Sequence, residues 1–268
     1  MSIHLDHFGL SAEPFSKELS DKDLWLPPSK QHVVDELVEA IEARESVALT
    51  GDSGVGKTCV LRATRARVPS DRFRLTYCHN ATLGRRDFYR QLCLALGLAP
   101  SATAAAVFYA VSTHVQELAE TRVHPVFVLD EAHLLHQDTL DHLHILLNYA
   151  WDSRALLSLV LVGLSELDER LHLKRNRSLF SRLHRRLEIE PTTPEDTLDY
   201  LRVRVRNAGV DRDLFAEDAV ALLHEAAHGA LREIDRIAST CLRHAARKKR
   251  KVVDRDVVSR VLKAAARS

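Results

Sequence analysis

Gly51-Asp52-Ser53-Gly54-Val55-Gly56-Lys57-Thr58 decides the fold, because this stretch matches the pattern G-x-x-x-x-G-K-[ST] at every defined position. Glycines let backbone amides wrap around phosphates, Lys57 can reach the beta and gamma phosphates, and the Thr58 hydroxyl can ligate magnesium. A strand is expected at residues 46–50 and a helix from about Gly56, which is the order of a phosphate site rather than of an incidental glycine turn. The predicted nucleotide contacts are Gly51, Asp52, Ser53, Gly54, Val55, Gly56, Lys57, Thr58 and Cys59.

A second motif, Val126-Phe127-Val128-Leu129-Asp130-Glu131, reads as an apolar strand that ends in two acids. In one parallel sheet with the strand at 46–50, these acids would lie beside the phosphate loop. Asp130 would hold magnesium through water, and Glu131 would orient and deprotonate an attacking water. The alternative is that both acids only cap the next helix. Together the two motifs predict ATP and Mg²⁺ as cofactors and ATP hydrolysis as the reaction.

The rest of the chain alternates strands with helices. Strands are expected at residues 46–50, 73–78, 126–130, 156–162 and 187–189, with helices mainly at 31–43, 86–96, 104–120 and 139–151. Such alternation predicts an α/β fold with a parallel sheet covered on both faces.

After Pro191 only helical periods remain. Thr193 followed by Pro194 and two acids is a strong helix start, and helices at 217–227, 231–247 and 254–265 complete a four-helix lobe. In the opening, from His7 to Pro28, the apolar residues show neither helical nor strand periodicity, so this stretch should be an irregular arm. We therefore expect an arm and first helix at 1–45, a nucleotide-binding core at 46–191 and a helical lid at 192–268.

Composition predicts a soluble cytoplasmic protein. The 268 residues are 46% hydrophobic and 28% charged, with a formal charge of +1, so any surface for nucleic acid must be local. No apolar run could span a membrane, and no signal peptide is expected. The 15 histidines and the four scattered cysteines suggest no metal site of their own. The cysteines are Cys59, Cys78, Cys93 and Cys241.

Phosphoryl transfer also needs positive charge against the transition state, which a neighbouring subunit can supply as an arginine finger. Four arginines cluster just before the strand expected at 187–189, namely Arg177, Arg182, Arg185 and Arg186. Arg182 is the first candidate and Arg185 or Arg186 the second; the alternative is a solvated basic face. Arg232, at the start of a lid helix, could reach the nucleotide, unless it forms an ordinary salt bridge.

With both motifs and the lid, the sequence resembles the AAA+ ATPases. More narrowly, it resembles the ExeA (general secretion protein A) family, which also includes TniB-type and TnsC-type transposition ATPases. The resemblance covers nearly the whole chain. It is carried by Phe8-Gly9-Leu10, Pro14-Phe15, the phosphate loop, Asp130-Glu131-Ala132-His133, Leu161-Val162-Gly163 with Glu166-Leu167, and Gly229-Ala230-Leu231-Arg232.

The resemblance implies a five-stranded parallel sheet, a helical lid, nucleotide at a subunit interface, and ATP-dependent rings or filaments. Arg232 matches the sensor-2 arginine, and Arg182 lies where related transposition ATPases carry their finger. One departure concerns sensor 1, because Gly163 is followed by Leu164 and Ser165 where the family has a polar residue. Either Ser165 takes over as the sensor or gamma-phosphate sensing is weakened, so we expect slow hydrolysis without DNA or a partner.

Secretion members of this family continue into a membrane span and a cell-wall-binding module, whereas this sequence ends at Ser268. A free-standing ATPase of this length resembles a transposition helper, which assembles on duplex DNA with ATP and recruits a transposase. The alternatives are an ATPase of secretion or envelope assembly and a nucleotide-switched protein scaffold.

Local clusters of arginine and lysine could bind the DNA backbone without reading its sequence, in a salt-sensitive way. Arg62 and Arg65 lie on the helix after the phosphate loop, Arg85 and Arg86 open another helix, and residues 243–251 include six Lys and Arg. The alternative is a solvated face, above all for the run 247–251 at a helix end.

Overall fold

The computed structural model describes residues 3–16, 18, 24–78, 85–99, 103–148 and 154–266. By their internal contacts, the residues form two compact units. We call Met1–Gln31, Asp52–Arg62 and Glu190–Ser268 the helical unit, and His32–Gly51 and Ala63–Ile189 the sheet unit. The domain boundaries expected from the sequence stay a prediction.

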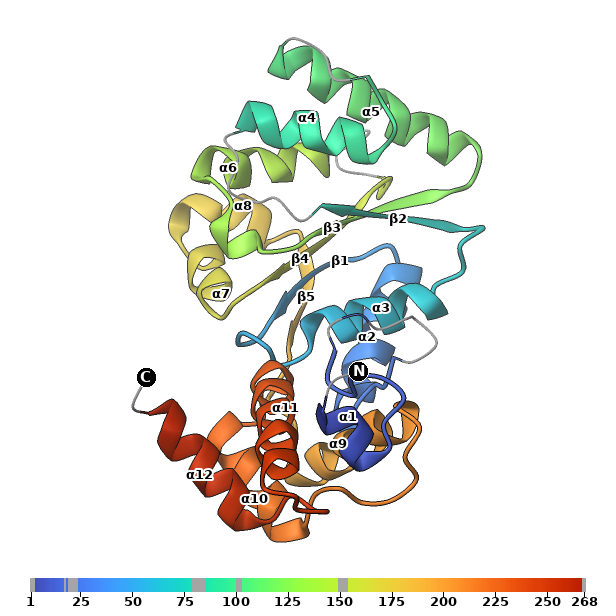
Figure 1. The fold of residues 1–268 in the computed structure, drawn as a ribbon. Helices are drawn as coiled ribbons and strands as arrows, with labels where there is room; N and C mark the ends of the chain where they lie inside the picture. Colours follow the sequence, from blue (N-terminus) through green and yellow to red (C-terminus); the bar gives the residue numbers. More distant parts are fainter. Residues whose placement is uncertain are drawn as a thin grey trace. The chain divides into compact units, whose positions relative to one another are not determined.

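The sheet unit is built on five parallel strands in the order β2-β3-β4-β1-β5 (Figure 1). Every residue of β3 and β4 is buried, as expected for central strands of a parallel sheet that is covered on both faces. The strands are β1 (Ser46–Thr50), β2 (Phe73–Cys78), β3 (His124–Leu129), β4 (Ser158–Gly163) and β5 (Leu183–Glu188).

The edge strand β5 differs from its expected position, because it begins at Leu183 rather than at Leu187. Leu183 and Leu187 are buried, while the residues between them are exposed or half-buried. The expectation that Arg185 and Arg186 lie before the strand was therefore wrong, since both lie within it. Only one face of this edge strand is apolar, so it lacks the continuous hydrophobic run of β3.

Helices cover the sheet. Figure 1 shows α4 and α5 together above β2 and β3, where Tyr89, Leu92, Phe127 and Leu140 belong to one buried core. The helix expected to reach Trp151 ends at Leu146, and residues 149–153 lie outside the described residues. The elements are α2 (Gln31–Glu42), α4 (Arg85–Ala95), α5 (Ala104–Glu120), η3 (Ala132–Leu134), α6 (Gln137–Leu146), α7 (Glu166–Leu171), η4 (Lys174–Asn176) and α8 (Arg177–Phe180). Helix α3 (Lys57–Arg67) begins in the helical unit and ends in the sheet unit.

The helical unit contains the four lid helices. Helix α9 starts at the predicted place with a complete capping box, in which Thr193 and Asp196 each bond the other's backbone N–H. Its neighbours bury one face each, for example Ile234, Ala238 and Cys241 of α11. The helices are η2 (Pro28–Lys30), α9 (Pro194–Asn207), α10 (Glu217–Ala227), α11 (Leu231–Arg247) and α12 (Arg255–Ala265).

The N-terminal segment packs within this same unit. The expectation of a wholly irregular arm was wrong at its start, because Ile3–Phe8 form the short helix α1. Its periodic signal is a single pair of buried residues, His4 and Phe8, which is too short to detect as a helix. Further on, the buried Arg204 donates from Nη2 to the carbonyl of Ser16 (2.7 Å) and ties the arm to α9.

The expected fold class is confirmed: a five-stranded parallel sheet flanked by helices, with a helical C-terminal region. Among the described residues, no helix combines the length and the apolar character needed to cross a membrane.

Candidate nucleotide-binding site

The phosphate loop follows β1 directly, and two of its glycines are required by geometry. Gly54 and Gly56 have φ values of +83° and +110°, which side-chain-bearing residues rarely adopt. A Cβ at Gly54 would lie 3.0 Å from Cβ of Arg232, and a Cβ at Gly56 would lie 3.3 Å from Cδ1 of Leu231. The loop thus needs glycine both for its backbone and for the close approach of α11.

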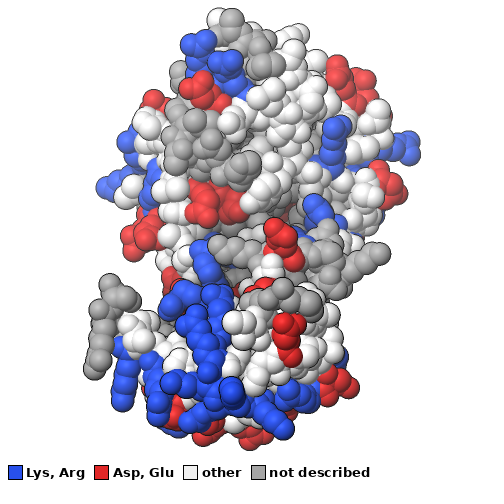
Figure 2. Space-filling model, viewed as in Figure 1, with Lys and Arg blue, Asp and Glu red and all other residues white. Residues whose placement is uncertain are grey.

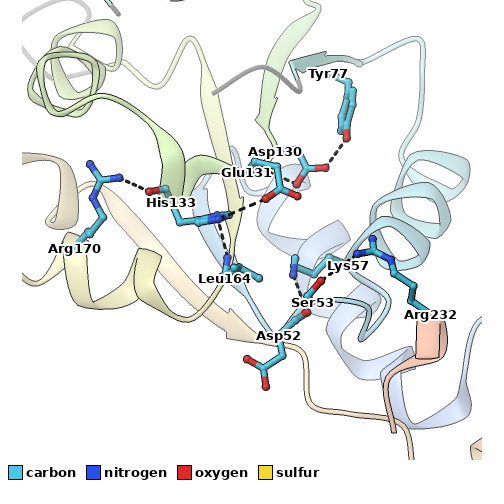
Figure 3. A network of polar contacts seen from close by, with 10 residues as sticks. All are labelled: Asp52, Ser53, Lys57, Tyr77, Asp130, Glu131, His133, Leu164, Arg170 and Arg232. Carbon is cyan, nitrogen blue, oxygen red and sulfur yellow. Dashed lines mark hydrogen bonds and ion pairs between the residues drawn. The ribbon is translucent and has the colours of Figure 1, made fainter. Parts of the chain in front are cut away.

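Arg232 is held against this loop, while its sensor-2 role stays a prediction. Its Nη1 donates to Oγ of Ser53 at 3.1 Å (Figure 3). Its backbone N–H donates to the carbonyl of Gly54 at 3.4 Å. Lys57 folds back on the same loop, with Nζ 2.9 Å from the carbonyl of Asp52. Helix α11 therefore contacts the phosphate loop through Arg232.

The remaining predicted contacts occupy the loop and the first turn of α3. Thr58 is exposed and Cys59 is half-buried, and burial raises the pKa of the Cys59 thiol. Lys30, which the sequence did not single out, is buried near Gly56 and donates to the carbonyl of Glu190 (2.6 Å). Burial lowers the pKa of Lys30.

In the sheet unit, Asp130 follows β3 and is held at both carboxylate oxygens. Oδ1 accepts the backbone N–H of Glu131 (2.9 Å), and Oδ2 accepts the hydroxyl of Tyr77 (2.5 Å) (Figure 3). Burial and the bond to Asp130 raise the pKa of Tyr77, so the phenol stays a donor. Asp130 is thus a fixed acceptor at the carboxyl end of β3.

Glu131 has an unusual backbone and one defined side-chain neighbour. Its φ of +55° is left-handed, which is rare for a residue other than glycine, and it starts the turn η3. Nε2 of His133 lies 3.6 Å from Oε2 of Glu131, and the N–H of Leu164 donates to Nδ1 of His133 (3.4 Å). Because Nδ1 accepts the N–H of Leu164, Nε2 is the ring nitrogen that faces the carboxylate.

Two residues fix η3 in place. Arg170 on α7 donates to the carbonyl of His133 and, from Nη2, to that of Leu135 (2.8 Å). Burial lowers the pKa of Arg170 from its usual value. Gly163 allows the turn to approach β4, since a Cβ there would lie 3.1 Å from the backbone nitrogen of His133.

Sequence reasoning missed Tyr77, Arg170 and the role of His133. Tyr77 is opposite Val128 in the β2–β3 pairing, a neighbourhood that depends on the strand order. The histidine was visible in the segment from Asp130 to His133, but its bond to the backbone of Leu164 depends on the fold. Ser165, the predicted sensor, is exposed at the start of α7, and its role stays a prediction.

The finger candidates have different surroundings. Nε of Arg185 lies 2.7 Å from Oε2 of Glu45, and its Nη1 lies 3.0 Å from Oε2 of Glu39, so this side chain is held within its own subunit. Arg186 stacks over the ring of Phe180 at 4.4 Å. Arg182 follows α8 and donates to the carbonyl of Ser178 (3.0 Å). Arg177 is exposed and begins α8.

The predicted DNA contacts lie on two helices, α3 and α4. Arg62 is half-buried and Arg65 exposed on α3, and Arg86 is exposed on α4. Arg85 begins α4, but its side chain lies outside the described residues.

The side chains suit magnesium bound with nucleotide rather than a permanent metal. In the part of the chain that the structure describes, no group of three or more His, Cys, Asp and Glu could hold an ion. A hydroxyl such as Thr58 and a carboxylate such as Asp130 are the few protein oxygens that Mg²⁺ uses when phosphates and water complete its shell.

Comparison with known proteins fits this geometry. Residues 40–171 match the family model described as an AAA domain. The strand order, the phosphate loop and the acids after β3 give the chain the fold of the P-loop ATPases of the AAA+ class.

The chain is similar to General secretion pathway protein A of Aeromonas hydrophila, with 29% identity over 259 residues. The match covers 95% of this chain and 47% of the relative, so the chain spans about half the length of that protein.

Solved structures show the same fold. Cdc6p from Pyrobaculum aerophilum matches with a TM-score of 0.70 and 18% identity, over 94% of this chain and 70% of that one. The Drosophila ORC bound to DNA matches with a TM-score of 0.71 and 18% identity, over 97% and 65%.

Proposed function

We propose that this chain is an ATPase that binds duplex DNA in its ATP-bound state, irrespective of DNA sequence, and acts as a DNA transposition helper in rings or filaments. The observation that carries the nucleotide dependence is the contact of Arg232 with Ser53 and Gly54. A phosphate in the loop would change the partners of this arginine and hence bias the lid helix.

Each side chain has a role in the proposed hydrolysis. Lys57 would leave the carbonyl of Asp52 to bind the beta and gamma phosphates. Glu131 would accept a proton from the attacking water, with His133 fixing its orientation. Thr58 and Asp130 would hold Mg²⁺, which neutralises charge on the phosphates when bound. Ser165 is the proposed sensor, and Arg182 the finger offered to a neighbouring subunit.

Support for DNA as ligand comes from the fold and from charge. The solved ORC structure with this fold is bound to DNA, and this chain concentrates Lys and Arg locally although its formal charge is only +1. The transposase partner and membership of the TniB-type or TnsC-type group rest on the resemblance described above.

A second candidate is an ATPase of secretion or envelope assembly. The observation that favours it is the similarity to General secretion pathway protein A over 95% of this chain. Such an ATPase would act on protein partners at a membrane and would not need DNA affinity.

The deciding experiment measures binding of the purified chain to random-sequence duplex DNA with ATP, with ADP, and for Lys57→Ala with ATP, at low and moderate salt. We expect binding with ATP that is lost in the variant and weakened by salt. Absence of binding under every nucleotide would exclude the DNA role and leave the secretion ATPase or a protein scaffold.

A further inference from the structure

Helix α11 presents a line of arginines on one face. Its exposed residues are Arg232, Arg236, Thr240, Arg243 and Arg247, which are spaced three and four apart and so lie on one side of the helix. The opposite face is buried in the core of the helical unit through residues such as Ile234 and Leu242. We call Arg232, Arg236, Arg243 and Arg247 the arginine track.

Charge is segregated around this helix. Residues 231–268 contain 12 Lys and Arg against 4 Asp and Glu, a net charge of +8 in a chain of +1. The neighbouring helix α10 has three acids and neither Lys nor Arg. Figure 2 shows Lys and Arg side chains gathered over the part of the surface where α11 runs. An ordinary solvated surface intersperses positive and negative side chains, whereas this one is mainly positive.

The two acids of α11 leave the track positive. Glu233 lies 2.8 Å from Nη2 of Arg236, and Asp235 points inward and accepts the hydroxyl of Tyr200 (2.7 Å). Beyond the helix, Lys248 and Lys249 are exposed, while Arg250 is ion-paired with Asp254 and Asp256. The run 247–251 is therefore not uniform, and its exposed lysines continue the track.

Helix physics argues for a ligand on this face. Arg243 and Arg247 are four apart, a spacing at which like charges destabilise a helix. Arg232 stands in the first turn, where the helix dipole disfavours a cation. A polyanion along the helix would offset both effects.

The length of the track matches an extended ligand. From Arg232 to Arg247 the helix rises about 22 Å at 1.5 Å per residue. Duplex DNA carries one negative charge for about every 1.7 Å of its axis, so several phosphates could face these arginines.

We propose that the arginine track is the surface of this chain that binds the phosphate backbone of duplex DNA. This inference rests on the proposed function and identifies the DNA-contacting surface, in place of Arg62, Arg65, Arg85 and Arg86. Because the first arginine of the track contacts the phosphate loop, nucleotide in the loop and DNA on the helix act on one rigid element. The track thereby gives DNA binding its dependence on ATP.

The test compares two double variants. The track variant carries Arg243→Gln and Arg247→Gln, and the matched control carries Arg206→Gln and Arg212→Gln. Both pairs are exposed, belong to the helical unit and remove two charges. Binding to random duplex DNA with ATP and Mg²⁺ is measured over a salt series, with nucleotide affinity and thermal unfolding as checks on the fold.

We expect the track variant to lose at least about tenfold in DNA affinity and the slope of log K against log salt to become shallower by about 2, the value for two lost phosphate contacts. The control should keep the wild-type slope. Unchanged DNA binding in the track variant, or an equal loss in the control, would overturn the inference, while the proposed function would stand if Lys57→Ala still lost binding. A wild-type chain without DNA affinity would overturn both.

Discussion

At the residue scale, each acid after β3 has one side chain that bonds it or faces it. Tyr77, 53 residues earlier in the chain, holds Asp130, and His133 faces Glu131 while it accepts from the backbone of Leu164. The position after Gly163, where a polar sensor was expected, thus contributes through its backbone N–H. His133 gives Leu164 a connection to Glu131 that its apolar side chain could not make.

This arrangement predicts that His133 matters for turnover and not for binding. In His133→Ala, we expect kcat for ATP hydrolysis to fall by about tenfold to a hundredfold, the loss typical when an orienting neighbour is removed. Nucleotide affinity, followed by a fluorescent ATP analogue, should stay within about twofold. The conservative His133→Asn can still accept from Leu164 but is too short to reach Glu131, so it should fold well and remain slow. Wild-type turnover in both variants would exclude a positioning role.

The motif residues could be predicted from sequence because their spacing is local. The phosphate loop and the two acids are continuous stretches, and Arg232 follows a recognisable glycine segment. Tyr77 and Arg170 could not be predicted in the same way, since their contacts depend on which strands are neighbours and on a turn after β3. A single sequence without structure does not specify those neighbours.

At the scale of elements, the buried strands were the easiest to predict. β1, β3 and β4 are apolar runs, and the first two end in the residues that define the site. The predicted range of β5 was too short because arginines interrupt its apolar residues. Helix α1 was not predicted because so short a helix shows too little periodicity. Local pattern identifies an element when its whole length is buried or amphipathic, and fails at edges and ends.

One contact between strands makes stability depend on pH. His124 at the start of β3 is 5% exposed, and its Nε2 lies 2.9 Å from Oγ of Ser158 on β4. Burial, with a smaller contribution from Arg44, lowers the pKa of His124 from 6.5 to about 4. The folded state therefore keeps this ring neutral while the unfolded chain binds a proton, and the free energy of unfolding contributed by this residue is lost as pH falls from 6.5 towards 4.

The free energy of unfolding should fall by about 3 kcal/mol between pH 6.5 and pH 4 because of this residue. Urea unfolding at pH 7, 6, 5 and 4.5 would measure it, with His124→Gln as the reference that cannot titrate. The difference between the two proteins should shrink as the pH falls. A constant difference from pH 7 to 4.5 would show that His124 is protonated equally in both states.

At the scale of the whole molecule, the chain divides its chemistry between two compact units. The phosphate loop and the lid belong to the helical unit, and the acids after β3 belong to the sheet unit. The strongly basic segment also lies in the helical unit, since residues 231–268 have a net charge of +8 while the whole chain has +1. The hydrolysis we propose would use residues of both units, whereas the DNA affinity we propose, and its link to the phosphate loop through Arg232, requires only the helical unit.

If Arg182 acts in a neighbouring subunit, two inactive variants should restore each other. Glu131→Gln retains the finger and Arg182→Ala retains the base, so mixed assemblies contain some interfaces with both groups intact. We expect each variant alone to be nearly inactive and their equimolar mixture to recover roughly a quarter of wild-type turnover if subunits mix at random. ATPase assays at a fixed total concentration measure this, and Arg177→Ala serves as the control that should remain active alone. A mixture no more active than its parts would place the arginine in the same subunit or outside the reaction.

The left-handed backbone at Glu131 limits which amino acids mutation can substitute there. Valine, isoleucine and threonine would clash with their own backbone at a φ of +55°, whereas asparagine and glycine adopt it readily. The substitutions best tolerated by the fold at this position would therefore be ones that remove the carboxylate. If Glu131 is the proposed general base, such a variant would bind ATP and release it unhydrolysed, so the lifetime of its ATP-bound state would be set by the rate of nucleotide dissociation.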